Sequence, residues 1–383
     1  LKDAGILRGY RAIGRHSLLA GKNLTDPDWG QRYADNVSRD AKEWVVTPQP
    51  SFNCPIGCAY DARITTGPFS GYTVSLCGGG ENTEGAAAMI GVEDAGTALV
   101  LTDYYDAIGM DSSVAGCVIS MAFELYNRGL LTQEQTDGLE LTWGNHEAAM
   151  ELLDRMIRRE GFGAVLAQGM KAAAASLGPE AERALVHVKG SGMNLHDWRA
   201  AWSVLLGQVV AAASACWQGT GADALGLEPD LGYRTFTRND DLAGKPESVR
   251  RTQIKKLFDD CLGICWFATW GVENVTKLAP AALAAATGWD DFDTAEAFAV
   301  GERVINLERL IACRRGFTKS DEWDVSPRLL EAPPTGRAAG TAFGPHLKAL
   351  VHEYYDLMGW DKATGRPLSA TLERLGLADA IVT

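Results

Sequence analysis

Apolar side chains recur along much of this chain at the three- and four-residue spacing that is typical of amphipathic helices. The clearest example begins at Ser112 or Ser113, either of which can cap a helix, and ends at Gly129. The apolar face of this predicted helix is formed by Val114, Val118, Met121 and Leu125.

Further helices are predicted in both halves of the chain. One follows Trp143 and is ended by Gly161 and Gly163, and the next covers residues 164–177 up to Gly178-Pro179. The first of these carries Met150, Leu153, Met156 and Ile157 on one face. Later helices are predicted at 249–265, 295–314 and 345–358, with a loop rich in proline and glycine at 329–344.

The signal for β-strands is weak. Residues 72–76 and 184–188 are the best candidates, and the first fifty residues are polar and rich in turn-forming residues. The fold is therefore predicted to be mainly α, with two helical domains packed around a shared site. We place the boundary near residues 178–190, which gives domains 1–183 and 184–383.

Charge and length exclude some classes of protein. The 383 residues carry a net charge of −13, and this acidity argues against a nucleic-acid partner, because phosphates need a basic face. The longest apolar stretch, 204–216, is interrupted by Gln208 and is shorter than the roughly 20 residues that a membrane span needs. No signal peptide is visible, so we expect a cytoplasmic protein without a membrane partner. The chain opens at Leu1, which is expected of a fragment, an unusual start codon or a separately encoded portion.

The eight cysteines are candidates for metal chemistry. Cys54-Pro-Ile-Gly-Cys58 places two thiols on one tight loop, as iron–sulfur clusters require. Two buried free thiols are the alternative, and a zinc site is disfavoured because no histidine lies nearby. Cys117 and Cys313 are expected to be buried apolar residues.

A second candidate is a short motif that occurs twice in the chain. Asp106-Ala-Ile-Gly109-Met-Asp111 and Asp260-Cys-Leu-Gly263-Ile-Cys265 share the pattern Asp-x-x-Gly, one copy in each predicted domain and each near a helix end. A carboxylate there can accept hydrogen bonds from the N–H and NH₂ edge of a pterin ring. Taken alone, Asp-x-x-Gly is also a common turn.

At this point the sequence resembles the aldehyde ferredoxin oxidoreductase family of tungsten and molybdenum enzymes. The likeness covers nearly the whole chain and depends on the order and spacing of many short motifs. Besides the three motifs above, these are Trp143-Gly144, Arg159-Glu-Gly-Phe-Gly163, Leu166-Ala-Gln-Gly169, Val188-Lys-Gly190, His196-Asp-Trp-Arg199, Thr287-Gly-Trp289, Gly301-Glu-Arg303, Tyr354-Tyr355, Gly359-Trp-Asp361 and Leu375-Gly-Leu377.

The resemblance implies a set of cofactors and their ligands. Family members hold tungsten, or sometimes molybdenum, between two pterins, beside a 4Fe–4S cluster that passes electrons to ferredoxin. By position, Cys54, Cys58 and Cys265 match three of the four cluster ligands. The two Asp-x-x-Gly motifs match the pair that holds the pterins. The residues implied at the pterins are Asp106, Gly109, Asp111, Arg199, Asp260, Gly263 and Ile264.

The chain departs from the family at the cluster. Ser51 stands where the first cysteine ligand is expected, and a serine oxygen is a harder ligand than a thiolate. A three-iron cluster, an external ligand, rescue by Cys77 and loss of the cluster all stay open.

It departs again at the usual catalytic residues. Residues 70–74 lack the family's glutamate near the metal, and 213–218 lack its histidine. Glu81 and Glu84 in the following glycine-rich segment are candidate replacements, with two solvated loop acids as the alternative. His196 is the candidate base, with a structural histidine as the alternative.

The family's first, β-rich domain has no counterpart here, so we expect it to be missing or supplied by another polypeptide. Three functions follow. The first is an oxidoreductase that oxidises an aldehyde or reduces an activated acid, with a ferredoxin or iron–sulfur subunit as partner and an oligomeric state. The second is a non-catalytic or altered-reaction subunit of a multi-chain tungstoenzyme. The third, an unrelated all-α enzyme, lacks support, because the sequence contains no nucleophile elbow, phosphate-binding loop or His-Glu-x-x-His motif.

Overall fold

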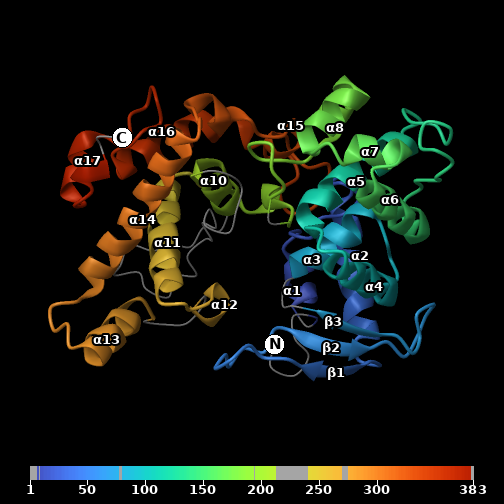
Figure 1. Cartoon of the computed structure of the whole chain (residues 1–383), viewed down its shortest axis with the longest axis horizontal. Coiled ribbons are helices and arrows are strands. Elements are labelled where there is room, and N and C mark those ends of the chain that lie inside the picture. The colour runs from blue at the N-terminus through green and yellow to red at the C-terminus, as the bar shows by residue number, and fades with distance from the viewer. Residues whose placement is uncertain are drawn as a thin grey trace. The chain divides into compact units, whose positions relative to one another are not determined.

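The structure is a computed structural model of the chain, and it describes residues 7, 9–76, 80–193, 195–212, 240–269 and 275–380. The chain forms two compact units. Unit 1 comprises Leu1–Ala200 and Ser326–Ala342, and unit 2 comprises Ala201–Val325 and Phe343–Thr383. Helices predominate in both (Figure 1), which confirms the predicted mainly α fold.

Unit 1 contains all the described helices and strands that precede residue 201, together with one helix from the later segment. Its helices are α1 (Tyr10–Arg15), α2 (Pro27–Asp40), α3 (Gly80–Ala86), α4 (Ala95–Ala107), α5 (Ser112–Asn127), α6 (His146–Arg158), α7 (Gly161–Leu166), α8 (Met170–Leu177), α9 (Pro179–Ala184) and α15 (Pro327–Leu330). Short 3₁₀ turns occupy Ala88–Ile90 and Trp198–Ala200.

A small antiparallel sheet completes unit 1. Strands β1 (Val45–Pro48), β2 (Tyr60–Arg63) and β3 (Thr73–Leu76) pair in that order. The register sets Val45 opposite Arg63 and Tyr60 opposite Leu76. The sheet packs through β3 against α4, and the loop between β1 and β2 carries Cys54 and Cys58.

Helices α3 and α5 cross closely because both have glycine at the contact. A Cβ atom on Gly116 of α5 would fall inside van der Waals contact of the Gly85 carbonyl oxygen, and one on Gly85 would meet the carbonyl oxygen of Ser112. The backbones therefore approach more closely than any side chain would allow.

Unit 2 is built on two long helices that lie side by side (Figure 1), α11 (Lys245–Cys261) and α14 (Thr294–Arg314). Here Gly301 lies directly against the Ile254 carbonyl. The unit's other helices are α10 (Trp202–Val210), α12 (Trp266–Thr269), α13 (Val275–Thr287), α16 (Gly344–Met358) and α17 (Ser369–Arg374), with 3₁₀ turns at Lys319–Trp323 and Ala378–Ala380.

Several sequence-based predictions need correction. The first fifty residues contain α1, α2 and β1 rather than turns alone. The predicted helix 164–177 is broken into α7 and α8, because Gly169 has a φ of 101° that ends one helix before the next begins. Residues 184–188 form no strand, although Val188 makes an isolated bridge to Ser191.

Two helix ends also differ from prediction. Asp111, rather than Ser112 or Ser113, caps α5, since its carboxylate accepts from the Val114 amide. Helix α6 ends at Arg159 in a left-handed conformation, and Gly161 begins α7 instead of only stopping α6. The side chain of Ile157, placed on the apolar face, is 49% exposed.

The division into units differs from the predicted boundary at residues 183 and 184. Unit 1 extends to Ala200 and includes the later segment Ser326–Ala342. The physical reason is polar pairing: the Asp197 amide donates to Leu18 O, and the Arg199 guanidinium donates to Leu24 O.

Among the described residues, no single helix has the length and apolar character to cross a membrane, and one bent pair, Gly80–Ile90 with Ala95–Ala107, passes by length and composition alone.

Candidate functional site

The three candidate catalytic side chains lie together in unit 1. Glu81 and Glu84 lie on α3, and His196 reaches them from the segment before the turn Trp198–Ala200. His196 Nδ1 is 2.6 Å from Glu84 Oε1, and His196 Nε2 is 3.5 Å from Glu81 Oε1. All three are buried, so the alternative of two solvated loop acids is wrong.

Close packing fixes this cluster in place. The Ala20 amide donates to Glu84 Oε2 at 2.8 Å. The His196 ring packs edge-on against Trp198, with ring centroids 4.9 Å apart. The chain approaching His196 runs tightly over the start of α5, because a Cβ on Gly192 would stand only 2.9 Å from the Cα of Val114.

Burial and charge shift the pKa values of both partners upward. Burial raises the pKa of Glu84 to about 7, although His196 and the Ala20 amide act in the opposite direction. For His196, burial alone lowers the pKa, but the carboxylates of Glu84 and Glu81 outweigh it and raise the pKa to about 9. The pair can therefore hold or release a proton near neutral pH, which is the property a general acid or base needs.

The two Asp-x-x-Gly motifs form the same backbone structure. Asp106 lies in the last turn of α4 and Asp260 in the last turn of α11. Gly109 and Gly263 follow with φ values of 68° and 70°. In each copy the glycine amide donates to the aspartate carbonyl, and the next amide donates to the carbonyl of the residue before the aspartate. This is the Schellman type of helix C-terminus.

Both turns lead directly into another helix and leave open space beside the glycine. Asp111 caps α5 in the first copy, and Cys265 occupies the matching position before α12 in the second. No atom lies within 4 Å of a Cβ built on Gly109 or Gly263. The first copy belongs to unit 1 and the second to unit 2, and their convergence on one site stays a prediction.

The side chains of the two copies have different surroundings. Lys256, one turn before Asp260 and itself buried, forms an ion pair with it at 2.7 Å. Asp106 has no such lysine; burial and the neighbouring Asp103 raise the pKa of its carboxyl. Sequence reasoning missed Lys256, although its i,i+4 spacing from Asp260 on a helix is a readable signal.

The Cys54–Cys58 loop is tight, as predicted. Gly57 has a φ of 60° and Asn53 a φ of 56°. Both thiols are partly accessible, and Ser51 is exposed. Among the described residues, no group of three or more His, Cys, Asp or Glu side chains is arranged to hold a metal ion. Cys265 is exposed in unit 2.

The remaining predicted residues have clear positions. The Arg199 guanidinium is buried and forms a two-point ion pair with Asp197, with Nε to Oδ1 at 2.8 Å and Nη2 to Oδ2 at 2.6 Å. Ile264 forms part of the second turn, and its amide donates to Asp259 O. Cys117 and Cys313 are buried, as predicted. Cys77 and residues 213–218 lie outside the described residues.

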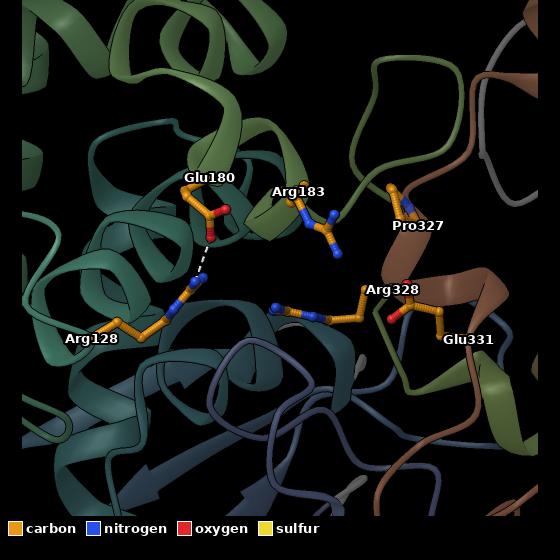
Figure 2. A pocket seen from close by; sticks show the side chains of 6 residues that line it. All are labelled: Arg128, Glu180, Arg183, Pro327, Arg328 and Glu331. Carbon is orange, nitrogen blue, oxygen red and sulfur yellow. Dashed lines mark hydrogen bonds and ion pairs between the residues drawn. The ribbon is translucent and has the colours of Figure 1, made fainter.

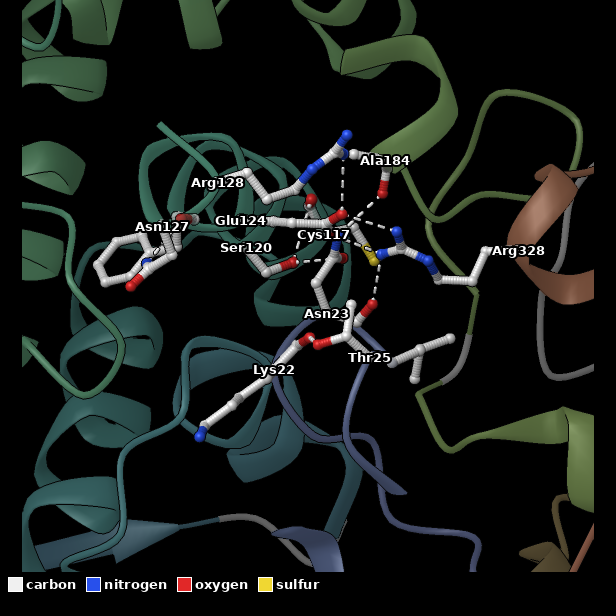
Figure 3. Close-up of polar contacts among 12 residues, drawn as sticks. Lys22, Asn23, Thr25, Cys117, Ser120, Glu124, Asn127, Arg128, Ala184 and Arg328 are labelled. Atoms are coloured by element: carbon white, nitrogen blue, oxygen red, sulfur yellow. Dashed lines mark hydrogen bonds and ion pairs between the residues drawn. The ribbon is translucent and has the colours of Figure 1, made fainter. Parts of the chain in front are cut away.

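A buried polar network in unit 1 was not predicted from the sequence (Figure 3). The Asn23 amide group donates to Glu124 Oε2 at 2.6 Å and to Ala184 O at 2.9 Å, and Ser120 donates to its oxygen at 3.0 Å. Arg328 reaches the same carboxylate, with Nη2 to Oε1 at 2.8 Å. The sequence offers no spacing signal for such distant partners.

The chain is similar to a known protein family and to several individual proteins. Residues 1–377 match the family model described as aldehyde ferredoxin oxidoreductase, domains 2 and 3. The tungsten-containing aldehyde ferredoxin oxidoreductase of Pyrococcus abyssi (strain GE5 / Orsay) is 30% identical over 96% of this chain. The aliphatic sulfonate oxidoreductase, WOR-like subunit, of Pyrococcus furiosus is 26% identical over 92% of it. The chain spans 59% and 55% of the length of these two relatives, respectively.

A solved structure shares the fold. The active site complex BamBC of benzoyl coenzyme A reductase, in complex with 1,5-dienoyl-CoA, superimposes with a TM-score of 0.70 over 96% of this chain and 58% of that one, at 20% identity. The match over residues 1–377 is decisive for classification. This chain therefore belongs to the aldehyde ferredoxin oxidoreductase family, whose domains 2 and 3 it matches.

Proposed function

We propose that this chain is the pterin-binding, proton-handling part of a tungsten-dependent oxidoreductase that oxidises an aldehyde to a carboxylic acid or reduces an activated acid. The observation that carries the proposal is the duplicated turn at Asp106 and Asp260. Two copies of one backbone structure, far apart in the sequence, suit two copies of one ligand. The names of the tungsten-containing relatives support the choice of metal.

The residues of both turns fit a pterin. Asp106 and Asp260 present carboxylates that can accept from its N–H and NH₂ groups. Gly109 and Gly263 leave open space in which a flat ring can approach the backbone. When bound, the tungsten bis-pterin would supply two-electron redox chemistry. Three further residues are assigned to the pterin sites only because their positions in the sequence match those of the family: Asp111, Arg199 and Ile264.

The donor set for a 4Fe–4S cluster is less complete. Cys54 and Cys58 provide two accessible thiols on one loop, in the second and third ligand positions, with Cys265 as the proposed fourth ligand and Ser51 in the first position. Thiolate ligation is expected only where thiols stay reduced, so a cytoplasmic location is part of the proposal. Electrons would leave through a ferredoxin or an iron–sulfur subunit.

Glu84 and His196 are the proposed acid–base pair. Oxidation of an aldehyde to an acid consumes water and releases two protons with two electrons. A buried carboxyl group with a pKa of about 7 beside an imidazole can accept a proton from that water and pass it on. Glu81, 3.5 Å from the far ring nitrogen, holds the imidazole from its other side.

The test is elemental analysis combined with electron paramagnetic resonance on anaerobically purified protein. Asp106→Asn and Asp260→Asn are each expected to lower retained tungsten and pterin by about tenfold or more, because each weakens a charged hydrogen-bond acceptor. Asp290→Asn, at an exposed aspartate of unit 2, should retain both at the wild-type level. Wild-type protein without tungsten, molybdenum or iron would refute the proposal.

A second function is favoured by one observation. Serine stands in place of cysteine at the first ligand position, residue 51, as expected of a non-catalytic or altered-reaction subunit in a multi-chain tungstoenzyme. That alternative predicts stable binding to a partner chain without iron absorbance in the isolated protein. A brown chain with a cluster signal would exclude it.

A further inference from the structure

A polar pocket in unit 1 lies outside the site described above. Its cavity is about 230 Å³ and is lined by Arg128, Glu180, Arg183, Pro327, Arg328 and Glu331. Pockets for drug-sized ligands measure about 300–1,000 Å³, so this cavity suits a smaller ligand. Three of the six lining residues are arginines, in a protein with 36 basic and 49 acidic residues.

The guanidinium groups point into the same space from three elements. Figure 2 shows Arg128 from the end of α5, Arg183 from α9 and Arg328 from α15 converging on the cavity. Arg328 and Arg128 are anchored from behind by Glu124, which is only 4% exposed. Arg128 also pairs with Glu180. Two of the three arginines are therefore held in position before any ligand arrives.

Arg183 and Glu331 differ from the others. Neither side chain forms a hydrogen bond or ion pair with any other described residue. Arg183 thus offers its whole set of N–H donors to the cavity, while Glu331 offers a free carboxylate. Counting Glu124, three positive charges meet three negative ones, so a fully ionised anion gains little net attraction.

A carboxylate and guanidinium donors in one cavity favour an anion that both accepts and donates hydrogen bonds, which means an anion that still carries a proton. We propose that the pocket binds free hydrogen phosphate, which keeps one proton at neutral pH. A phosphate monoester, with a second pKa of about 6, has mostly lost it. The oxygens of phosphate accept from Arg183 and from the anchored arginines, as guanidinium forks commonly bind phosphate. Its P–OH group donates to the carboxylate of Glu331, which would repel an anion without a proton.

Sulfate provides the discriminating comparison, because it has the same shape as phosphate but no proton at neutral pH. The pocket is expected to bind phosphate about tenfold more tightly than sulfate, which is the ratio that one charge-assisted hydrogen bond supports. This expectation does not depend on the proposed redox function.

The experiment is calorimetric titration of the purified chain with inorganic phosphate, sulfate and glycerol phosphate near neutral pH. Arg183→Gln is expected to weaken phosphate binding about tenfold. Arg63→Gln, at an exposed arginine on β2, should leave it unchanged. Glu331→Gln should strengthen sulfate binding and so reduce the preference for phosphate.

The outcomes separate the possibilities. Glycerol phosphate carries mostly no proton on its phosphate group at neutral pH, so it is expected to bind more weakly than free phosphate, and equal affinity for the two overturns the proposal. No phosphate binding at millimolar concentration overturns the proposal. So does equal affinity for sulfate in the wild type, or an equal loss in Arg63→Gln. Arg183 and Glu331 are exposed, so their variants should fold normally, which thermal denaturation would check.

Discussion

The pairing of Glu84 with His196 makes the stability of unit 1 dependent on pH. Both pKa values lie above the ordinary ones, so the folded chain holds these protons more tightly than the unfolded chain does. Stability from Glu84 is therefore lost as pH rises from about 4.5 to about 7, and stability from His196 is lost from about 6.5 to about 9.

We predict that the free energy of unfolding falls by on the order of 3 kcal/mol between pH 6.5 and pH 9, through His196 alone. Chemical denaturation at a series of pH values measures this change. The double variant Glu84→Gln, His196→Gln removes both titrating groups and should flatten the profile. A wild-type profile that rises over this range would contradict the assignment.

At single residues, the sequence was informative where the signal is local. Asp106 and Gly109 form a predictable turn because a left-handed glycine next to a helix end involves only neighbouring amides. The contact between Glu84 and His196 was not predictable in this way. It depends on how the segment before Trp198 crosses α3, and no residue spacing records that crossing.

Between elements, the crossing of α3 and α5 is the tightest contact near the candidate site. Gly116→Ala would force a methyl group against the Gly85 carbonyl, so the helices must separate. We predict a loss of about 1–3 kcal/mol in the free energy of unfolding, the usual cost of overpacking. Ser113→Ala, on the same helix at a less buried position, should change it by less than about 0.5 kcal/mol.

The same variant tests whether the crossing positions the acids. Glu81 and Glu84 precede Gly85 on α3, so displacement of this helix should lower the pKa of His196 by moving carboxylates away from its ring. Nuclear magnetic resonance titration of the imidazole measures this shift. An unchanged pKa in a clearly destabilised Gly116→Ala protein would show that the acids are positioned by other contacts.

Periodicity predicted the long helices of both units, although α5 and α11 are buried along continuous stretches rather than on one face only. Helices α11, α14 and α16 begin and end within a few residues of the predicted bounds. Periodicity did not predict the break within residues 164–177, because an alanine-rich pattern does not show that Gly169 will end the helix. It also missed β1 and β2, whose strands are too short to show alternation.

At the scale of the whole molecule, the path of the chain links the two units. The segment Ser326–Ala342 belongs to unit 1, while the residues on both sides of it along the chain belong to unit 2. The sequence pattern predicted a single boundary between two domains, because it is read in chain order. It cannot show that a later segment packs with the first unit. Arg328 holds this segment in unit 1, because its guanidinium donates to the carboxylate of Glu124 and to the Asn23 carbonyl.

Arg328→Met should therefore weaken the packing of the segment Ser326–Ala342 in unit 1. The variant leaves the buried Glu124 with Arg128 and Asn23 as partners, and we predict a loss of about 2–4 kcal/mol from unit 1, because a buried charge loses its best counter-ion. Scanning calorimetry should show a transition at lower temperature that splits from the transition of unit 2. Adding Glu124→Gln removes the unpaired charge and should recover part of the loss. If Glu124→Gln destabilises the Arg328→Met protein as much as it destabilises the wild type, the two side chains act independently. Their ion pair then does not hold the segment Ser326–Ala342 in unit 1.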